Sequence, residues 1–198
     1  MKNAFRSGPR VVLRPLEAGE APLFQAWLND PENLQYLQRS RPLTLAEERK
    51  WLEAAPERTE EHLFGIALRE GERLIGGCGL HGTSLPHRRG DLGIVIGEPE
   101  AQGKGYGSEA IRLLLDYGFG TLGLHRVGLH VYANNERGIR CYEKCGFRRE
   151  GVLREARWWA GRWWDILEYA MLDHEWQSAA AGDPRRGKAS LSPRNAAT

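Results

Sequence analysis

The residues best placed to do chemistry form a glycine-rich run, Gln102-Gly103-Lys104-Gly105-Tyr106-Gly107. The run stands between a strand-like stretch, residues 91–97, and a helix-like stretch, residues 108–119. Alternating glycines allow a tight turn and a close approach of the backbone to a ligand. A helix that begins here presents amide N–H groups without internal partners, and such groups bind anions, typically phosphate. The run therefore indicates a ligand that carries a pyrophosphate.

Two common nucleotide-binding motifs do not account for this run. A dinucleotide-binding fingerprint, G-x-G-x-x-G, needs a wider spacing before its third glycine. A phosphate-binding P-loop needs its lysine to be followed by Ser or Thr, whereas Gly105 follows Lys104. Neither a Rossmann-type site nor a P-loop is therefore expected.

The spacing that does fit is Q-x-x-G-x-G, with Gln102, Gly105 and Gly107 at its fixed positions. It resembles the acyl-CoA-binding signature of the GNAT family of acetyltransferases. The resemblance implies that acetyl-CoA is the cosubstrate.

A second segment strengthens this resemblance. It is similar to the late signature of the family, in which Asn135 ends a strand, Tyr142 follows seven residues later, and Gly146-Phe147 comes next. The resemblance runs from about residue 11 to residue 176. After Leu124 it is closest to the branch with ribosomal-protein N-terminal acetyltransferases and polyamine acetyltransferases.

The resemblance also implies which residues hold acetyl-CoA. The backbone amides of residues 103–108 would cradle the pyrophosphate, with Lys104 adding charge outside the turn. The backbone at the end of the preceding strand would pair with the pantetheine arm like an added strand. The residues expected to bind the cosubstrate are Ile94, Val95, Ile96, Gln102, Gly103, Lys104, Gly105, Tyr106, Gly107, Ser108, Asn134 and Asn135.

The role of Asn135 has two compatible interpretations. The resemblance implies that its side chain hydrogen-bonds the pantetheine arm, with Asn134 as a weaker candidate. Asn is also well suited to cap the helix that begins there.

Acetyl transfer to an amine needs a group that protonates the departing thiolate. The resemblance assigns this role to Tyr142. A tyrosine has an ordinary pKa of about 10 and is protonated at neutral pH, as a general acid must be. The alternative is that Tyr142 is a core-facing aromatic residue of an amphipathic helix.

The amine must also lose a proton before it attacks. His130 lies five residues before Asn135 on an expected strand, where some members of the family have a catalytic Glu. A His there could accept the proton directly or through water. The alternative is a hydrogen-bonded sheet histidine, and Asp91 is a second candidate for the base.

The remaining sequence indicates how these residues are positioned. Alternating or apolar stretches predict strands, and patterns of period 3.6 predict helices. Thr44 and Glu47 form a capping box at the beginning of one helix. The expected strands are 10–16, 62–69, 73–80, 91–96, 125–132, 147–158 and 163–172, the expected helices are 18–29, 44–55, 108–119 and 135–144, and residues 81–90 are an expected loop.

This order predicts an α+β fold. About seven strands form a mostly antiparallel sheet with helices on both faces, which gives three layers. The same order is that of the GNAT family. Residues 1–177 form the expected acetyltransferase domain, and residues 178–198 an expected disordered basic tail, because their composition has few large apolar residues.

The composition limits the other functions to be considered. A net charge of +2 over 198 residues does not indicate nucleic acid as a partner, and no apolar run is long enough to span a membrane. Three cysteines without metal-type spacing indicate packing residues in a reducing cytosol, so a cytoplasmic location and no metal are expected.

Four tryptophans, Trp158, Trp159, Trp163 and Trp164, flank a two-residue turn. One interpretation is cross-strand aromatic pairing within a hairpin. The other is a wall of the acceptor site or a contact in a homodimer. Residues 29–43 are expected to line the acceptor site and contain no charge run that would select a polycation.

The sequence thus favours an acetyl-CoA-dependent N-acetyltransferase that acts by direct transfer in a ternary complex. The acceptor is a primary amine, whether a protein N-terminus, a polyamine or another small amine. The alternative is a non-catalytic acyl-CoA-binding module that senses or scaffolds.

Overall fold

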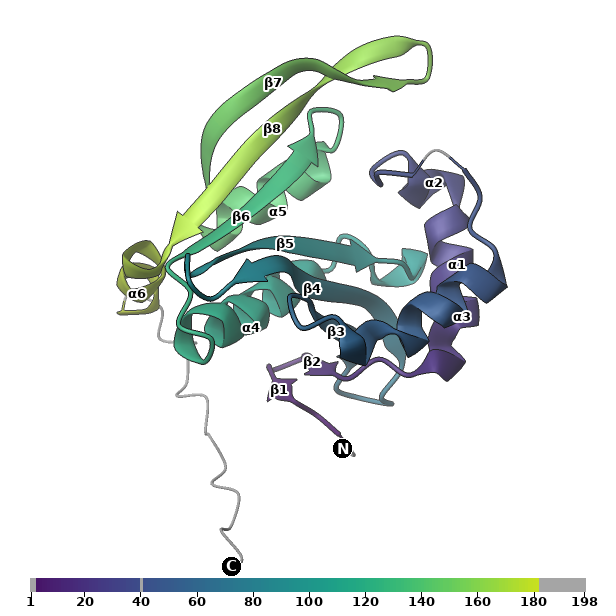
Figure 1. Cartoon of the computed structure of the whole chain (residues 1–198), viewed down its shortest axis with the longest axis horizontal. Coiled ribbons are helices and arrows are strands. Elements are labelled where there is room, and N and C mark those ends of the chain that lie inside the picture. Colours follow the sequence, from purple (N-terminus) through teal and green to yellow (C-terminus); the bar gives the residue numbers. More distant parts are fainter. Residues whose placement is uncertain (1–2, 40, 182–198) are drawn as a thin grey trace, which may run out of the picture.

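One eight-stranded sheet organises the chain (Figure 1). The computed structural model describes residues 3–39 and 41–181. The strands are β1 (Arg6–Ser7), β2 (Val11–Arg14), β3 (His62–Leu68), β4 (Leu74–Ser84), β5 (Arg89–Ile96), β6 (Arg126–Tyr132), β7 (Arg148–Trp159) and β8 (Arg162–Leu172). The α-helices are α1 (Ala21–Asn29), α2 (Pro31–Leu34), α3 (Leu45–Glu53), α4 (Tyr106–Gly120), α5 (Glu136–Cys145) and α6 (Asp173–Ala181), with short 3-10 turns at Ala18–Glu20, Ala55–Glu57 and Pro99–Ala101.

The sheet is mostly antiparallel, as expected. Its strand order is β1-β2-β3-β4-β5-β6-β8-β7, and β5 with β6 is the one parallel pair among the described strands. The final strands β7 and β8 project beyond the rest of the sheet as a long hairpin (Figure 1).

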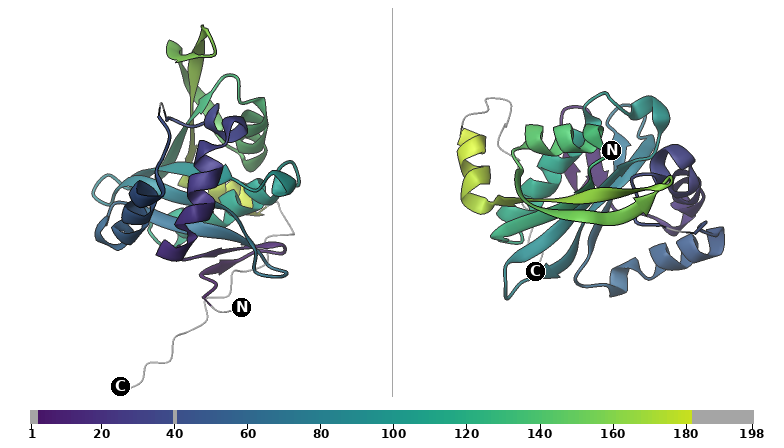
Figure 2. Two further views of the ribbon diagram at one scale, coloured as in Figure 1. Left: turned by 90° about the vertical axis from the view of Figure 1, so that its right-hand side faces the viewer. Right: turned by 90° about the horizontal axis from the view of Figure 1, so that it is seen from above.

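Helices cover both faces of the sheet, which confirms the three-layer α+β prediction. On β4, the seven residues from Leu74 to Leu80 are all buried, so neither face of this strand meets water. Cys78 and Leu80 belong to the main core with α4, whereas a side chain at Gly77 would meet Phe24 of α1 at 2.8 Å. Figure 2 shows α3 and α5 on opposite sides of the sheet.

The glycines of β4 are explained by close approach of other side chains. A Cβ at Gly77 would clash with Phe24, and a Cβ at Gly79 would lie 2.7 Å from Leu63. The strand therefore has no room for larger residues on this face.

Helix α3 begins as its sequence predicts. Thr44 Oγ1 accepts a hydrogen bond from the amide of Glu47, and the Glu47 carboxylate accepts one from the amide of Thr44. This reciprocal pair is a capping box. Arg41 and these bonds lower the pKa of Glu47 to about 2.

Several local predictions were wrong. The expected loop 81–90 is mostly strand, because β4 continues to Ser84 through a register shift at Gly82 and β5 begins at Arg89. Strand β1 was not expected. It forms because residues 6–7 pair with β2 while Phe5 stacks on Phe64 at 5.1 Å.

The C-terminal boundary also differs from the expectation. Helix α6 continues to Ala181, beyond the expected beginning of the tail at Ser178. Residues 182–198, which make up most of the expected disordered segment, lie outside the described residues. Within residues 3–39 and 41–181, no helix combines the length and apolarity that a bilayer crossing requires.

Candidate active site

A cavity of about 450 Å³ lies where β5 and β6 separate. The two strands pair only over residues 89–91 of β5 and 126–128 of β6, and no pairing continues beyond Asp91. The ends of both strands then line the cavity, with Ile94, Val95 and Ile96 from β5 and residues 130–132 from β6. The free backbone edge of β5 therefore faces an open space into which an extended ligand could pair.

The glycine-rich turn forms one end of this cavity. Gly103 and Gly105 have φ angles of 73° and 82°, in the left-handed region that favours glycine. Helix α4 begins at Tyr106, and the amide of Glu109 donates to the carbonyl of Gly105 at 3.2 Å. The amides before Glu109 belong to the first helical turn, which has no internal acceptors. The turn is thus built to receive an anion.

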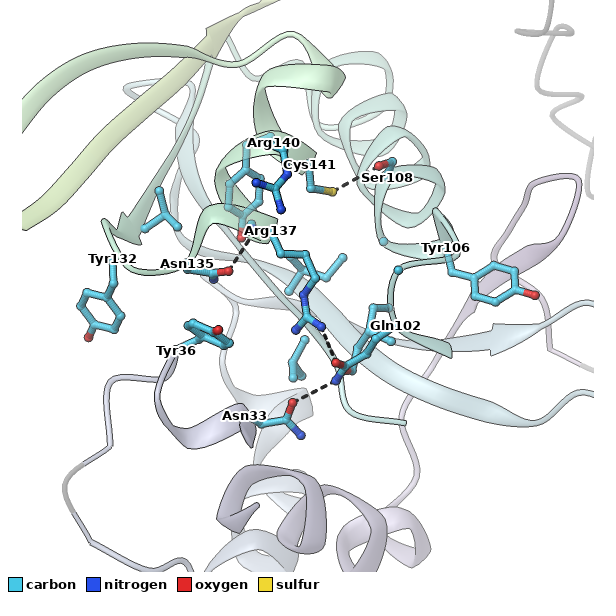
Figure 3. Close-up of a pocket in the computed structure, with 18 of the residues that line it drawn as sticks. Asn33, Tyr36, Gln102, Tyr106, Ser108, Tyr132, Asn135, Arg137, Arg140 and Cys141 are labelled. Carbon is cyan, nitrogen blue, oxygen red and sulfur yellow. Dashed lines mark hydrogen bonds between the residues drawn. The ribbon is translucent and has the colours of Figure 1, made fainter. Parts of the chain in front are cut away.

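Two residues of the turn, Lys104 and Tyr106, do not present their side chains to the cavity. Lys104 does not line the cavity; its carbonyl accepts a hydrogen bond from Arg10 at 3.0 Å. The ring of Tyr106 points away from the cavity (Figure 3), and the Arg10 guanidinium lies 5.0 Å from its centroid. Tyr106 can therefore contribute its backbone amide to the site, but its hydroxyl faces elsewhere.

One face of α5 supplies positive charge that was not expected from the sequence. Arg137, Arg140 and Lys144 all line the cavity. Their spacing of three and four residues places them on one side of the helix, and that spacing was the available signal. Among the described residues that line the cavity, none is Asp or Glu. The cavity is therefore suited to a ligand with several phosphate groups.

The side chain of Gln102 is held by the protein itself (Figure 3). Its Nε2 donates to the Ile96 carbonyl at 2.8 Å and to Asn33 Oδ1 at 3.1 Å, and its Oε1 accepts from Arg137. Gln102 is therefore placed to fix the turn between β5, α2 and α5.

The two asparagines after β6 are placed differently. Asn135 lines the cavity and caps α5, because its Oδ1 accepts from the amide of Gly138 at 2.8 Å. The capping interpretation is confirmed, and the Nδ2 group remains for a ligand. Asn134 does not line the cavity, and its Oδ1 is buried without a partner in the described part of the chain.

Tyr142 lies on α5 and lines the same cavity. Its side chain is 9% exposed and its ring packs edge-on against Phe147 at 6.1 Å. Burial raises the pKa of its hydroxyl above the ordinary value. The hydroxyl is thus protonated at neutral pH and can donate a proton. The core-facing and functional interpretations are compatible here, since the residue packs in the core and also reaches the cavity.

His130 also lines the cavity, from the middle of β6. It stands opposite Glu168 of β8 in the sheet register, and its Nε2 lies 3.3 Å from Glu168 Oε1. The imidazole is about half exposed. A histidine held by a carboxylate at the cavity wall has the placement that a general base needs.

Asp91 does not line this cavity. It belongs to a second, smaller hollow together with Arg89, Gly90 and Arg126. The reason is the strand register, because Asp91 is paired with Gly128 at the closed end of the β5–β6 junction, before the strands separate. The structure thus separates Asp91 from Tyr142 and His130, which weakens its candidacy as the base.

Cys141 is a cavity residue that the sequence did not single out. Its Sγ lies 3.2 Å from Ser108 Oγ, at the beginning of α4 (Figure 3). The Cys145 thiol lowers the pKa of Cys141 below its ordinary value, and the same interaction raises the pKa of Cys145. Cys145 Sγ itself donates to the Ser108 carbonyl at 3.6 Å. Cys141 is therefore more readily ionised than an ordinary thiol.

The structure confirms cross-strand aromatic pairing for one pair of tryptophans in the hairpin. Trp158 and Trp163 stand opposite each other, with ring centroids 5.2 Å apart, and both are more than half exposed. Arg157, beside them, is buried and donates to the Gln35 carbonyl after α2. The hairpin is thus joined to the segment that follows α2.

Comparison with known proteins gives a consistent result. A family model described as an acetyltransferase (GNAT) domain matches residues 10–148. The chain is 28% identical over 170 residues to an uncharacterized N-acetyltransferase, p20, of Bacillus licheniformis. That match covers 84% of this chain and 95% of the Bacillus protein. It is 37% identical over 105 residues to spermidine N(1)-acetyltransferase of Vibrio cholerae, and the match covers 53% of this chain and 60% of that enzyme, less than two thirds of its length.

Solved structures are similar as well. The crystal structure of spermidine N-acetyltransferase from Vibrio cholerae in complex with CoA and spermine has a TM-score of 0.79 and 29% identity, and the match covers 84% of this chain and 98% of that one. A dodecameric structure of the Vibrio enzyme has a TM-score of 0.74 and 28% identity, with 85% and 97% coverage.

Proposed function

Since the chain belongs to the GNAT acetyltransferases and is an acetyl-CoA-dependent N-acetyltransferase, we propose that it acetylates a primary amine by direct transfer in the cavity between β5 and β6. One observation carries this proposal. The glycine turn at the beginning of α4, the free edge of β5 and the buried hydroxyl-bearing Tyr142 all line one cavity. These three features match the pyrophosphate, the pantetheine arm and the thiol of acetyl-CoA.

In this proposal the cosubstrate extends along β5. The amides of residues 103–108 hold the pyrophosphate, and Arg137, Arg140 and Lys144 neutralise the phosphate charges. The backbone of residues 94–96 pairs with the pantetheine arm. Asn135 donates to that arm from the Nδ2 group that its capping bond leaves available.

The transfer itself needs three proton movements. His130 removes a proton from the ammonium form of the acceptor, directly or through water, and Glu168 orients its imidazole. The free amine attacks the thioester carbonyl, a C–N bond forms and the C–S bond breaks. Tyr142 gives its proton to the departing CoA sulfur, and the second proton that the nitrogen loses as the amide forms passes, directly or through water, to the Tyr142 oxygen and restores its hydroxyl.

The alternative of a non-catalytic acyl-CoA sensor has no support. A sensor needs the glycine turn but has no use for a proton donor and a proton acceptor in the same cavity. Both Tyr142 and His130 line it. The relatives reported above are described as N-acetyltransferases.

The acceptor is a small amine or a protein N-terminus, and the Vibrio relative acts on spermidine. A dodecameric neighbour also favours self-association of this chain. The decisive experiment incubates the protein with acetyl-CoA and a panel of polyamines, monoamines and N-terminal peptides, and measures CoA thiol release. We expect release that depends on one class of amine, together with the acetylated product by mass spectrometry. Binding of acetyl-CoA without release for any amine would favour the sensor instead.

A further inference from the structure

The acceptor end of the cavity lies away from the glycine turn. If the phosphates occupy the turn and the cationic face of α5, the amine must approach from the opposite end. That end is lined by Tyr36, Leu37 and Gln38 from the segment after α2, and by His130 and Tyr132 of β6. Aromatic, apolar and amide groups thus surround the position where the acceptor binds.

No carboxylate among the described residues lines this end. Acidic groups on the neighbouring elements make hydrogen bonds of their own. Glu168 is hydrogen-bonded to His130, and Glu32 bonds the Gln35 amide at 3.5 Å on the exposed side of α2. Asp30 caps α2 by accepting from the amide of Glu32. A second ammonium group on the acceptor would therefore find no unengaged carboxylate on the cavity wall.

The aromatic rings at this end already interact with guanidinium groups of the chain. The Arg157 guanidinium lies 3.6 Å from the ring centroid of Tyr132, and that of Arg137 lies 5.9 Å from the ring centroid of Tyr36. Cation–π binding of an ammonium group would compete with these contacts. Arg137 faces the phosphates of the cosubstrate in the proposed function, whereas Arg157 lies beside Tyr132 at the acceptor end. A guanidinium carries a positive charge, and the field of Arg157 opposes a second positive charge on the acceptor.

Arg157 is fixed in this position. It is 9% exposed, and its Nη1 donates to the Gln35 carbonyl across 122 positions of sequence. Trp159 lies on it as well, with the ring centroid 4.9 Å from the guanidinium. The positive charge beside Tyr132 is therefore held in place by these contacts and does not swing away when an acceptor enters.

We propose that the acceptor is a primary monoamine whose remaining part is uncharged or anionic, and that the site discriminates against polyamines. This inference rests on the proposed function and narrows it. It separates the chain from its relatives that act on spermidine, through the residues at the acceptor end.

The experiment compares two probes that differ by one charge, 1-aminohexane and 1,6-diaminohexane, with spermidine as a third. Thiol release gives kcat/KM for each at a fixed acetyl-CoA concentration. After correction for its two equivalent amines, the kcat/KM of the diamine should be at least about tenfold lower, because a second positive charge near the Arg157 guanidinium finds no carboxylate on the cavity wall and is disfavoured. Equal or better use of the diamine or of spermidine would overturn the inference while supporting the proposed function. If acetyl-CoA binds and no primary amine in the full panel is acetylated, the proposed function fails and this inference fails with it.

A matched pair of variants tests whether charge at the acceptor end causes this selectivity between amines. Gln38 is exposed and lines the acceptor end, so Gln38→Glu places a carboxylate where the chain has none. The ratio of diamine to monoamine kcat/KM should rise up to about fivefold, as one exposed ion pair allows. The control, Gln177→Glu, adds the same charge on the exposed side of α6 and should leave the ratio unchanged. A ratio that is the same in both variants would contradict an electrostatic origin of the selectivity.

Discussion

The side-chain amide of Gln102 donates a hydrogen bond to Asn33 Oδ1 at 3.1 Å and thereby joins the glycine turn to α2. Asn33 is 4% exposed and donates in turn to the Trp27 carbonyl at 3.1 Å. The same Gln102 side chain also contacts β5 and α5 through Ile96 and Arg137. One residue of the signature thus connects the cosubstrate turn to the segment that leads to the acceptor end.

Replacement of Gln102 tests this connection. Gln102→Leu removes two donated hydrogen bonds and leaves the buried Asn33 oxygen without its partner. The expected cost is about 1–3 kcal/mol in the free energy of unfolding, with a several-fold rise in KM for acetyl-CoA because the turn is less firmly held. Urea denaturation and steady-state kinetics measure the two effects. Gln177→Leu, on the exposed side of α6, is the control. Equal denaturation midpoints for the two variants would contradict the role of Gln102.

A second prediction concerns the backbone of the glycine turn. Gly105→Glu puts a side chain and a negative charge at a residue with φ 82°, where the backbone must approach a pyrophosphate. Acetyl-CoA binding should be lost in calorimetry while the circular dichroism spectrum is retained. Gly71→Glu is the control, because its φ is 75° and nothing lies within 4 Å of an added Cβ. It bears similar backbone strain at a residue that does not line the cavity, and it should bind acetyl-CoA normally. Normal acetyl-CoA binding by a folded Gly105→Glu protein would show that the turn is not part of the acetyl-CoA site.

The predictable part of the site is the part encoded locally. Gln102, Gly105, Asn135 and Tyr142 occupy fixed spacings within a strand–turn–helix segment or at a helix beginning, so short-range sequence was enough to find them. The spacing of Arg137, Arg140 and Lys144 predicts that they share one face of a helix, but that spacing alone does not indicate a ligand.

Other features depend on long-range pairing and could not be read from the sequence. The bond from Arg157 to Gln35 spans 122 positions, and no local pattern encodes it. The separation of Asp91 from the cavity depends on where the β5–β6 pairing ends. The prediction of strands was correct for the sheet centre but missed β1, whose two residues carry too little pattern.

A third prediction concerns the proton donor. Tyr142→Phe keeps the buried ring and removes only the hydroxyl, so the fold should be unaffected. General acid catalysis typically contributes about 10²–10⁴-fold in rate. A thiolate is already a fair leaving group, so kcat should fall by about 10²-fold while acetyl-CoA affinity changes little. Tyr117→Phe is the control, because that hydroxyl bonds His62 and lies outside the cavity. A wild-type kcat in Tyr142→Phe would show that Tyr142 is only an aromatic residue of the core and not the proton donor.

A fourth prediction concerns the base. If the neutral imidazole of His130 accepts the proton, kcat/KM falls on the acidic side of the pH–rate profile, because protonation removes the acceptor. His130→Gln should lower the rate at neutral pH and abolish that acidic limb. The control, His174→Gln at an exposed position of α6, should keep both the rate at neutral pH and the acidic limb of the profile. An acidic limb that survives in His130→Gln would assign the base to another group and return His130 to a structural role in the sheet.

The fifth prediction uses the thiol in the cavity wall. The lowered pKa of Cys141 means that its thiolate forms at a lower pH than that of an ordinary thiol. Its alkylation by iodoacetamide should therefore level off at a lower pH than that of an ordinary thiol, which has a pKa of about 8.5 and reacts faster up to about pH 9. Acetyl-CoA should protect Cys141, because the thiol lines the cavity. Peptide mass spectrometry after timed alkylation gives the rate at each cysteine.

Two variants separate the cause of this reactivity from its location. Cys141→Ser should eliminate the fast phase, since Cys78 and Cys145 are buried and their thiol pKa values are raised. Cys145→Ala removes the thiol that is the main cause of the lowered pKa of Cys141. That pKa should then rise toward its ordinary value, and alkylation at pH 7 should slow by about two- to threefold, less than the loss of thiolate alone because a more basic thiolate is also more nucleophilic. If Cys145→Ala leaves the rate unchanged, the beginning of α4 and the neighbouring cations stabilise the thiolate instead, and the paired-thiol explanation is wrong.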